Sequence, residues 1–243
     1  MWRLSRPFLW VILAYVTVGR LAAAFGPPPR DALVVDFERA VTRGALPPLT
    51  AVDVPRWAAD LLSIAYVAYF ALPALLVGEL SRRRDREAVR VVTLTLAAAF
   101  YIHYALYVCV PVLGPMRTNA VPAAARDRFL AQGGAVTHVV RRTIGALEGT
   151  APDAFPSAHT SIALLAAAFA RKYRLRTRRA IYALTTMIVV AIIVLGYHYL
   201  TDIAAAAPIA GLVWAGVPLA LDRRVAQNQQ SAAWNSFIGF LSG

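Results

Sequence analysis

Cysteine and charged residues are scarce in this sequence. Cys109 is the single cysteine among 243 residues, which excludes an internal disulfide framework and a cysteine-ligated zinc site. It lies within an apolar run, so we predict that it is a small core residue. Charged residues make up 16% of the chain and hydrophobic residues 59%. A soluble domain could not keep so large an apolar fraction off its surface, and the composition therefore predicts a membrane protein.

Acidic residues are also few, and the 25 basic against 13 acidic residues give a formal net charge of +12. Such a charge can indicate nucleic-acid binding, but here the arginines form short clusters between long apolar runs. These clusters are typical of the cytoplasmic loops of membrane proteins. We therefore predict membrane lipids as partners and no nucleic acid, while the sequence gives no indication of the oligomeric state.

Six segments approach the length of about 20 mostly apolar residues that a membrane-spanning helix needs. We expect a single membrane domain over residues 1–243, an all-α polytopic bundle of six transmembrane helices with short interfacial helices in the outer loops. The expected spans cover residues 8–25, 57–80, 90–113, 158–172, 180–200 and 202–221.

The first of these spans has two interpretations. Arg3 and Arg6 ahead of the apolar stretch, with three alanines at residues 22–24 behind it, are also typical of a cleavable signal peptide. A retained helix gives the even number of spans that the loop charges favour, so we expect retention.

Loop charges predict the orientation of the bundle. Basic clusters occupy residues 3–6, 82–90, 171–179 and 223–224, which all fall on one side of the six expected spans. The positive-inside rule assigns that side to the cytoplasm. We therefore expect a plasma-membrane protein with both termini in the cytoplasm and the first, third and fifth loops outside.

Two of the outer loops are long enough to contain helices. In residues 26–56, Leu33, Val34 and Phe37 recur at helical spacing, which predicts a short amphipathic helix at the membrane interface over about 31–42. The longest loop, residues 114–155, could form one or two capping helices.

A first polar motif stands where the fourth span begins. Pro156 precedes Ser157, a natural N-cap, and His159 follows in the first turn. Ionisable groups at this depth are costly unless they are paired or face water, so each is a functional candidate. A helix that starts here presents free backbone N–H groups and the positive end of its dipole, which favours an anion such as phosphate.

A second motif lies at the end of the fifth span. His198 and Asp202 stand at i and i+4, so a continuing helix would let the carboxylate orient one ring nitrogen and leave the other basic. Because the fourth and fifth spans run in opposite directions, we expect His159 and His198 to face each other across one pocket. Arg117, after a non-helical turn at the end of the third span, lies at the same level and could clamp phosphate oxygens. Phosphoryl transfer requires such a set of groups.

These residues resemble the motifs of the type 2 phosphatidic acid phosphatase superfamily. The stretch Pro156-Ser157-Ala158-His159 is similar to its Pro-Ser-x-His motif, and His198-x-x-x-Asp202 is similar to the end of its third motif. The tyrosines beside His198 and the Gly-Pro-x-Arg turn at Arg117 look closer to the inositol phosphorylceramide synthase-like branch. The resemblance covers about residues 105–215, and the six-span layout is similar over the rest.

The resemblance implies a role for each matching residue. His198 would be the nucleophile and form a phosphohistidine, Asp202 would orient it, and His159 would protonate the leaving oxygen. Ser157 and Arg117 would hold the phosphate, and neither a metal nor another cofactor would be needed.

Two departures from the family pattern concern the phosphate ligands. The Ser-Arg pair that precedes the nucleophile falls on Ala191 and Ile192, and the lysine of the first motif is absent. Arg117, Arg141 or Arg142 could supply the missing positive charge.

The sequence thus predicts an integral-membrane lipid phosphatase or phosphotransferase that acts on a lipid-linked phosphate at the outer leaflet. Two alternatives stay open: inositol phosphorylceramide synthase-type transfer of a phospho-headgroup to a lipid alcohol, and a non-catalytic lipid-binding or transport protein of the same fold. Arg117 could also merely pair with an acid such as Asp153. For His103, deeper in the third span, we expect a packing role.

Overall fold

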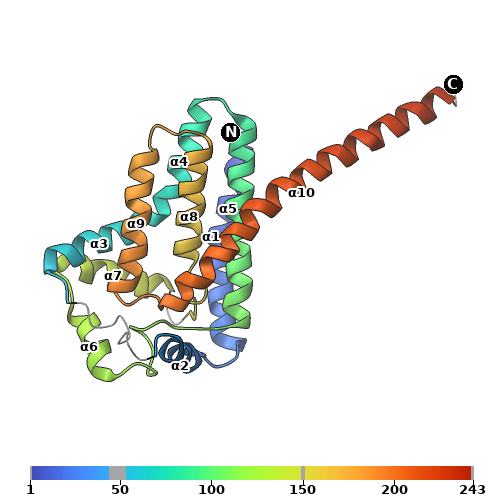
Figure 1. Ribbon diagram of the computed structural model, residues 1–243. Coiled ribbons are helices and arrows are strands. Elements are labelled where there is room, and N and C mark those ends of the chain that lie inside the picture. The colour runs from blue at the N-terminus through green and yellow to red at the C-terminus, as the bar shows by residue number, and fades with distance from the viewer. Residues whose placement is uncertain (1, 44–52, 149–150, 242–243) are drawn as a thin grey trace.

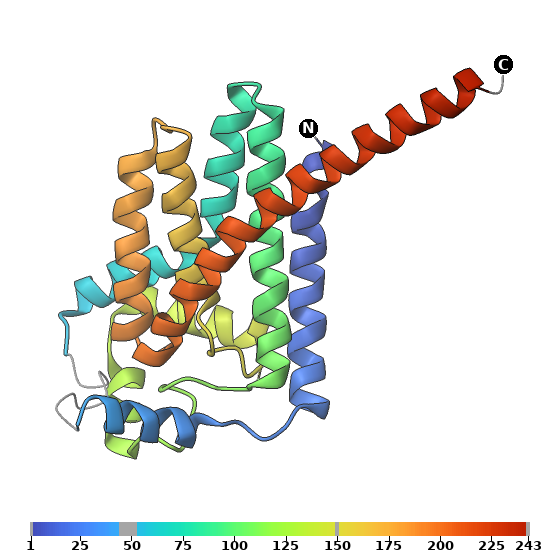
Figure 2. The same ribbon diagram turned by 45° about the vertical axis from the view of Figure 1, so that its right-hand side comes forward.

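The computed structural model describes residues 2–43, 53–148 and 151–241. This part of the chain is all-α, with 77% helix and no strand. Five helices run along one bundle, and a longer helix crosses them obliquely and extends beyond them (Figures 1 and 2). The five are α1 (Trp2–Phe25), α4 (Leu72–Arg82), α5 (Arg86–Cys109), α8 (Ala158–Lys172) and α9 (Arg178–Val194), and the oblique helix is α10 (Leu200–Leu241).

Helix α5 is the centre of the bundle, because it packs against α1, α4, α8 and α10. The core between these helices is made of large aliphatic and aromatic side chains with almost no exposed surface. They include Leu76, Leu80, Leu96, Ile162, Phe169 and Ile188. Alanines fill the positions between them on α8, which lets the helices approach closely.

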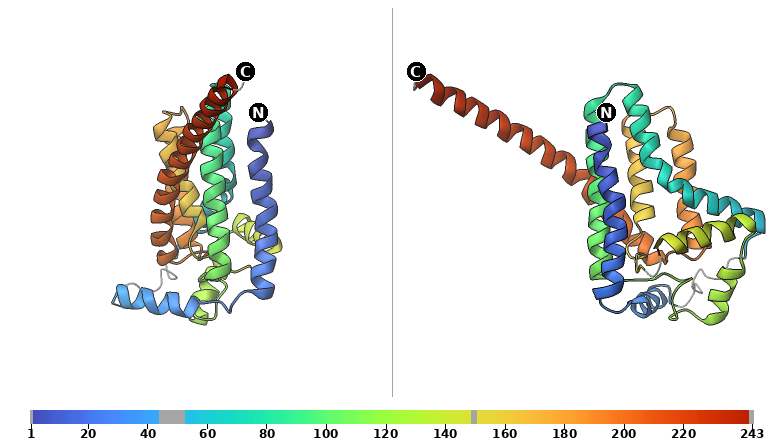
Figure 3. Two further views of the ribbon diagram at one scale, coloured as in Figure 1. Left: turned by 90° about the vertical axis from the view of Figure 1, so that its right-hand side faces the viewer. Right: turned by 180° about the vertical axis from the view of Figure 1, so that it is seen from behind.

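Four other helices lie across the bundle or cover one of its ends. Helix α3 (Arg56–Ala68) and α7 (Ala135–Glu148) pack side by side and run crosswise (Figure 3). Helices α2 (Asp31–Val41) and α6 (Ala123–Ala131) cover the end of the bundle at which α8 and α10 begin. The expected amphipathic helix near residues 31–42 and the expected helices of the third loop are therefore present.

The second expected span is bent rather than straight. A 3₁₀ turn, η1 (Tyr69–Ala71), separates α3 from α4, and Pro73 stands in the first turn of α4. Proline lacks a backbone N–H and is tolerated at the start of a helix but not inside one, so a new helix begins here in a different direction. Tyr66, just before this bend, and Tyr69, within it, contact the His159 ring in the first turn of α8.

The third and fifth expected spans end earlier than the sequence indicated. Helix α5 ends at Cys109 because Val110 precedes Pro111 and leaves helical geometry. Cys109 is exposed at this end, so the prediction that it lies in the core is wrong. Helix α9 ends at Val194, not at residue 200.

Three helical stretches of the described chain are long and apolar enough to cross a membrane, namely Arg56–Arg82, Arg86–Cys109 and Leu200–Asp222. They indicate a membrane protein. The six-span layout stays a prediction, since α8 has only 15 residues and α9 only 17.

The two ends of the bundle differ in character (Figure 1). The start of α1 and the Arg-rich connections α4–α5 and α8–α9 lie at one end, which we call the basic end. The start of α8, the start of α10 and the short helices α2 and α6 lie at the other, which we call the site end. At the basic end, Glu79 of α4 accepts hydrogen bonds from the backbone N–H of Arg176 and Thr177 and so supports the start of α9.

Candidate active site

The start of α8 places His159 at the site end. Ser157 is the N-cap, as the sequence predicted, and its Oγ accepts a hydrogen bond from the Thr160 backbone N–H at 3.2 Å. The Ser157 side chain is fully buried and does not line the pocket described below. The structure therefore places Ser157 as a helix cap, and its expected contact with phosphate stays a prediction.

A glycine-dependent turn carries His198. The backbone N–H groups of Gly196 and Tyr197 donate to the carbonyls of Ile193 and Ile192, at 3.1 and 2.9 Å, which is the Schellman arrangement that ends a helix. Gly196 has φ +78°, and a Cβ there would also meet the Phe129 ring at 2.7 Å. His198 consequently lies in a connection between two helices, and the expected continuous helix through this motif is wrong.

Asp202 still reaches His198, but from the following helix. It lies in the first turn of α10, where its Oδ2 accepts a hydrogen bond from the Tyr199 backbone N–H at 2.8 Å. The same oxygen lies 3.3 Å from Nδ1 of His198. Both side chains are almost fully buried. The carboxylate thus caps the N-terminus of α10 and faces the His198 imidazole at the same time.

The backbone around His198 fixes which ring nitrogen is free. Nδ1 of His198 lies 2.8 Å from the carbonyl oxygen of Ala154. A carbonyl oxygen only accepts, so Nδ1 carries the proton, and Asp202 offers the same N–H a second acceptor. In the neutral ring, Nε2 then keeps its lone pair. This is the form that a histidine nucleophile requires.

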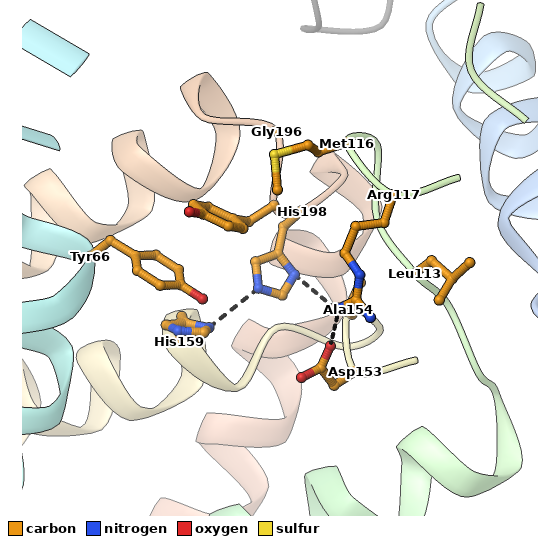
Figure 4. Close-up of a pocket in the computed structure, with 10 residues that line it drawn as sticks. Tyr66, Leu113, Met116, Arg117, Asp153, Ala154, His159, Gly196 and His198 are labelled. Carbon is orange, nitrogen blue, oxygen red and sulfur yellow. Dashed lines mark hydrogen bonds and ion pairs between the residues drawn. The ribbon is translucent and has the colours of Figure 1, made fainter. Parts of the chain in front are cut away.

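The two imidazoles meet as the sequence predicted. Nε2 of His198 lies 3.3 Å from Nδ1 of His159, with the ring centroids 5.4 Å apart at 63° (Figure 4). Since Nε2 of His198 accepts, Nδ1 of His159 donates. Nε2 of His159 is buried and has no hydrogen-bond partner in the described part of the chain. A phosphoryl group on His198 would therefore have to move the two rings apart.

Sequence reasoning missed the aromatic rings around His159. Tyr66 stacks on the His159 ring with centroids 4.6 Å apart, and Tyr69 contacts the ring at 4.3 Å. Tyr197 stacks on Tyr66 in turn, at 4.3 Å. The spacing of Tyr66 and Tyr69, three residues apart on one side of an apolar helix, was the signal available. Their rings hold the His159 imidazole in one orientation.

Arg117 reaches the same pocket, beside His198 (Figure 4). Its guanidinium forms an ion pair with Asp153, with 3.4 Å between nitrogen and oxygen. The pairing that we considered as an alternative is thus present, and Arg117 still lines the pocket. The pocket and the open space at its mouth together measure about 330 Å³. It is lined by Tyr66, Leu113, Met116, Arg117, Asp153, Ala154, His159, Gly196, Tyr197 and His198.

The other two candidate arginines are not brought into the pocket. Arg141 of α7 donates to the carbonyls of Leu130 and Gln132, and so fastens α7 to the end of α6. Burial lowers the pKa of the Arg141 guanidinium, and the nearby Tyr197 hydroxyl offsets only part of this effect. The side chain of Arg142 is exposed on the surface of α7. Ala191 and Ile192, where the family motif has Ser-Arg, are fully buried in the core.

Helix α2 is tied to the pocket by its acidic residues, which the sequence did not suggest. The Asp31 carboxylate accepts from the backbone N–H groups of Leu113 and Gly114, both at 3.0 Å, and from the Tyr199 hydroxyl at 3.1 Å. Glu38 accepts from the backbone N–H of Thr201 at 2.7 Å. The amphipathic helix therefore connects the loop that carries Arg117 to the start of α10.

Groups that could bind metal do not gather in this site. Among residues 2–43, 53–148 and 151–241 there is no set of three or more histidine, cysteine, aspartate or glutamate side chains that could hold an ion. His103 is buried between α5 and α8, with Nδ1 at 2.8 Å from the Ala99 carbonyl and Nε2 at 3.1 Å from the Ser161 hydroxyl. This placement fits the packing role that we expected.

Comparison with known protein families identifies a match to this chain. The family profile described as the PAP2 superfamily matches residues 32–216, which include His159, His198 and Asp202. No curated protein and no solved structure matches the chain. Members of this superfamily are phosphatases, which makes a phosphatase-type enzyme the expected class. Because the profile covers most of the sequence, the chain belongs to the PAP2 superfamily.

Proposed function

We propose that the protein is a membrane phosphatase or phosphotransferase that acts on a lipid-linked phosphate through a phosphohistidine at His198. One observation carries the proposal: the two imidazoles of His159 and His198 are in direct contact in a pocket that also holds the Arg117 guanidinium. A nucleophile, a proton donor and a cation are the groups that phosphoryl transfer needs.

The proposed reaction has two steps. Nε2 of His198 attacks phosphorus, a P–N bond forms, and the P–O bond to the lipid alcohol breaks while His159 donates a proton to the leaving oxygen. Water or a second alcohol then attacks phosphorus, gives its proton to His159, and releases His198. The first acceptor gives hydrolysis and the second gives transfer of the phospho-group to a new alcohol, as in an inositol phosphorylceramide synthase.

The surroundings of His159 bear on its role as the acid. The His159 ring becomes neutral after it donates the Nδ1 proton only if it starts as the imidazolium, with a proton on Nε2 as well. Nε2 has no acceptor among the described residues, so the protein around it does not favour that cation. The negative charge of a bound phosphate would stabilise the imidazolium, and we propose that His159 is protonated when the substrate binds.

Charge on the loops supports an orientation for this reaction. The Arg-rich loops lie at the basic end and the two histidines lie at the site end (Figure 1). By the positive-inside rule, we propose that the basic end and both termini face the cytoplasm of a plasma-membrane protein. The pocket would then open at the outer leaflet.

The test is turnover of a defined lipid phosphate by the full chain in detergent micelles, with released phosphate and transferred product measured separately. We expect His198→Ala to lower kcat by about 10³-fold or more. His138 lies exposed on α7, and His138→Ala is the matched control that should leave turnover unchanged. A His198→Ala protein with intact function would instead support a lipid-binding or transport protein of the same fold. Product identity distinguishes a phosphatase from a transferase.

A further inference from the structure

A ligand that binds the Arg117 guanidinium has to compete with Asp153 for it. Arg117 and Asp153 are the charged residues among those that line the pocket, and they face each other at 3.4 Å (Figure 4). Their side chains are 24% and 16% exposed, so the pair is shielded from most of the solvent. Asp202 adds a second carboxylate behind His198. The lining therefore has no excess of positive charge.

Contacts with two distant parts of the chain hold Asp153 in position. Its Oδ2 accepts a hydrogen bond from the Tyr15 hydroxyl of α1 at 2.6 Å. Its backbone pairs with Val112 in an isolated β-bridge, and the N–H of the next residue, Ala154, donates to the Val112 carbonyl at 2.9 Å. The Ala154 carbonyl in turn holds His198. The backbone at Asp153 is thus tied to Val112 and, through Ala154, to His198, while Tyr15 holds the carboxylate. We therefore expect the carboxylate to stay in the pocket when a ligand binds.

A ligand that engages Arg117 must therefore accept a carboxylate as a neighbour. A bare phosphate dianion meets like charge there, and it also draws the guanidinium away from Asp153. A ligand with its own hydrogen-bond donor can replace Arg117 on the carboxylate, so that neither charge is left unpaired. The distance between Arg117 and Asp153 requires this donor to lie only a few atoms from the phosphorus.

We propose that Asp153 determines specificity at this site. It favours phosphate esters that carry an ammonium or hydroxyl group a few atoms from phosphorus, and it disfavours phosphate esters without such a donor. The inference rests on the proposed function in one respect, that the pocket takes a phosphate. It does not depend on whether His198 performs chemistry.

The experiment measures binding to the full chain in detergent micelles by titration calorimetry. The probes are phosphoethanolamine and propyl phosphate, which have the same chain length but differ in the terminal ammonium, and inorganic phosphate. For the unaltered protein we expect phosphoethanolamine to bind about tenfold more tightly than propyl phosphate. Asp153→Asn should abolish this preference and tighten binding of inorganic phosphate by about tenfold. Asp127→Asn, an exposed position on α6, is the matched control and should change neither value.

Three results would overturn the inference: a preference that persists in Asp153→Asn, inorganic phosphate that binds no more tightly to that variant, or no measurable binding of any probe to either protein. Tyr15→Phe keeps the charge of Asp153 and removes one hydrogen bond, so it should retain the preference for phosphoethanolamine and shows whether Asp153→Asn acts through charge. Turnover by His198→Ala would refute the proposed chemistry and leave these binding results unaffected.

Discussion

Replacing Asp202 by asparagine separates its charge from its position. The asparagine oxygen can still accept the Tyr199 backbone N–H, so the start of α10 should be preserved. The negative charge that faces Nδ1 of His198 at 3.3 Å is lost. At an effective dielectric constant of about 20, two full charges at that distance attract by roughly 5 kcal/mol, which is an upper limit for the effect on a developing imidazolium.

The expected loss of rate is smaller than this limit because Ala154 also holds the His198 ring. Its carbonyl keeps Nδ1 protonated and Nε2 free in the asparagine variant. In a triad where the aspartate sets the tautomer, the same substitution lowers kcat by about 10⁴-fold. We expect Asp202→Asn to lower kcat by about 10² to 10³-fold, or roughly 3 to 4 kcal/mol, with little change in KM.

The assay is steady-state turnover of a short-chain lipid phosphate in mixed micelles, with kcat and KM determined separately. Thermal unfolding in the same detergent checks that the variant is folded. A loss of kcat well above about 10³-fold would mean that the Ala154 carbonyl does not hold the ring by itself. Unchanged kcat would mean that Asp202 only closes the start of α10, and the proposed role of its charge would be refuted.

Other contacts lead to further predictions. Tyr66→Leu removes a ring that stacks on His159, so we expect steady-state turnover to show a kcat about three- to tenfold lower with a small effect on KM. An unchanged kcat would show that the stacking has no catalytic effect. Glu38→Ala removes the acceptor at the start of α10 and should lower the free energy of unfolding by about 1 kcal/mol, visible as a lower Tm. Arg141→Gln should also lower the Tm because it removes the hydrogen bonds from α7 to the end of α6. Arg142→Gln, at an exposed position, should change neither Tm nor KM. An increase in KM for Arg142→Gln would instead indicate that Arg142 binds the phosphate.

The features that the sequence predicted correctly depend on local patterns and on the alternating direction of successive spans. Ser157 is an N-cap because a short polar side chain precedes an apolar helix after a proline. The helix at residues 31–41 follows from its apolar spacing. His159 and His198 meet because one starts a segment and the other ends the next, so both fall at the same end of the bundle.

The features that the sequence could not provide depend on contacts between distant parts of the chain. The i, i+4 spacing suggested that His198 and Asp202 share a helix, but a positive φ at Gly196 ends α9 first, and the pair meets across a turn. The link from Tyr15 to Asp153 joins residues 138 apart in sequence. Such pairings follow from tertiary packing, which helical periodicity does not encode.

The central claim is that Nε2 of His198 is the atom that forms the bond to phosphorus. Rapid quenching of the full chain with an isotopically labelled lipid phosphate, followed by mass spectrometry of peptides, tests it directly. We predict an acid-labile phosphate on His198 that is absent from His198→Ala and forms more slowly, but at the same residue, in His159→Ala. A label on His159 instead, or turnover by His198→Ala without any phosphohistidine, would contradict the account.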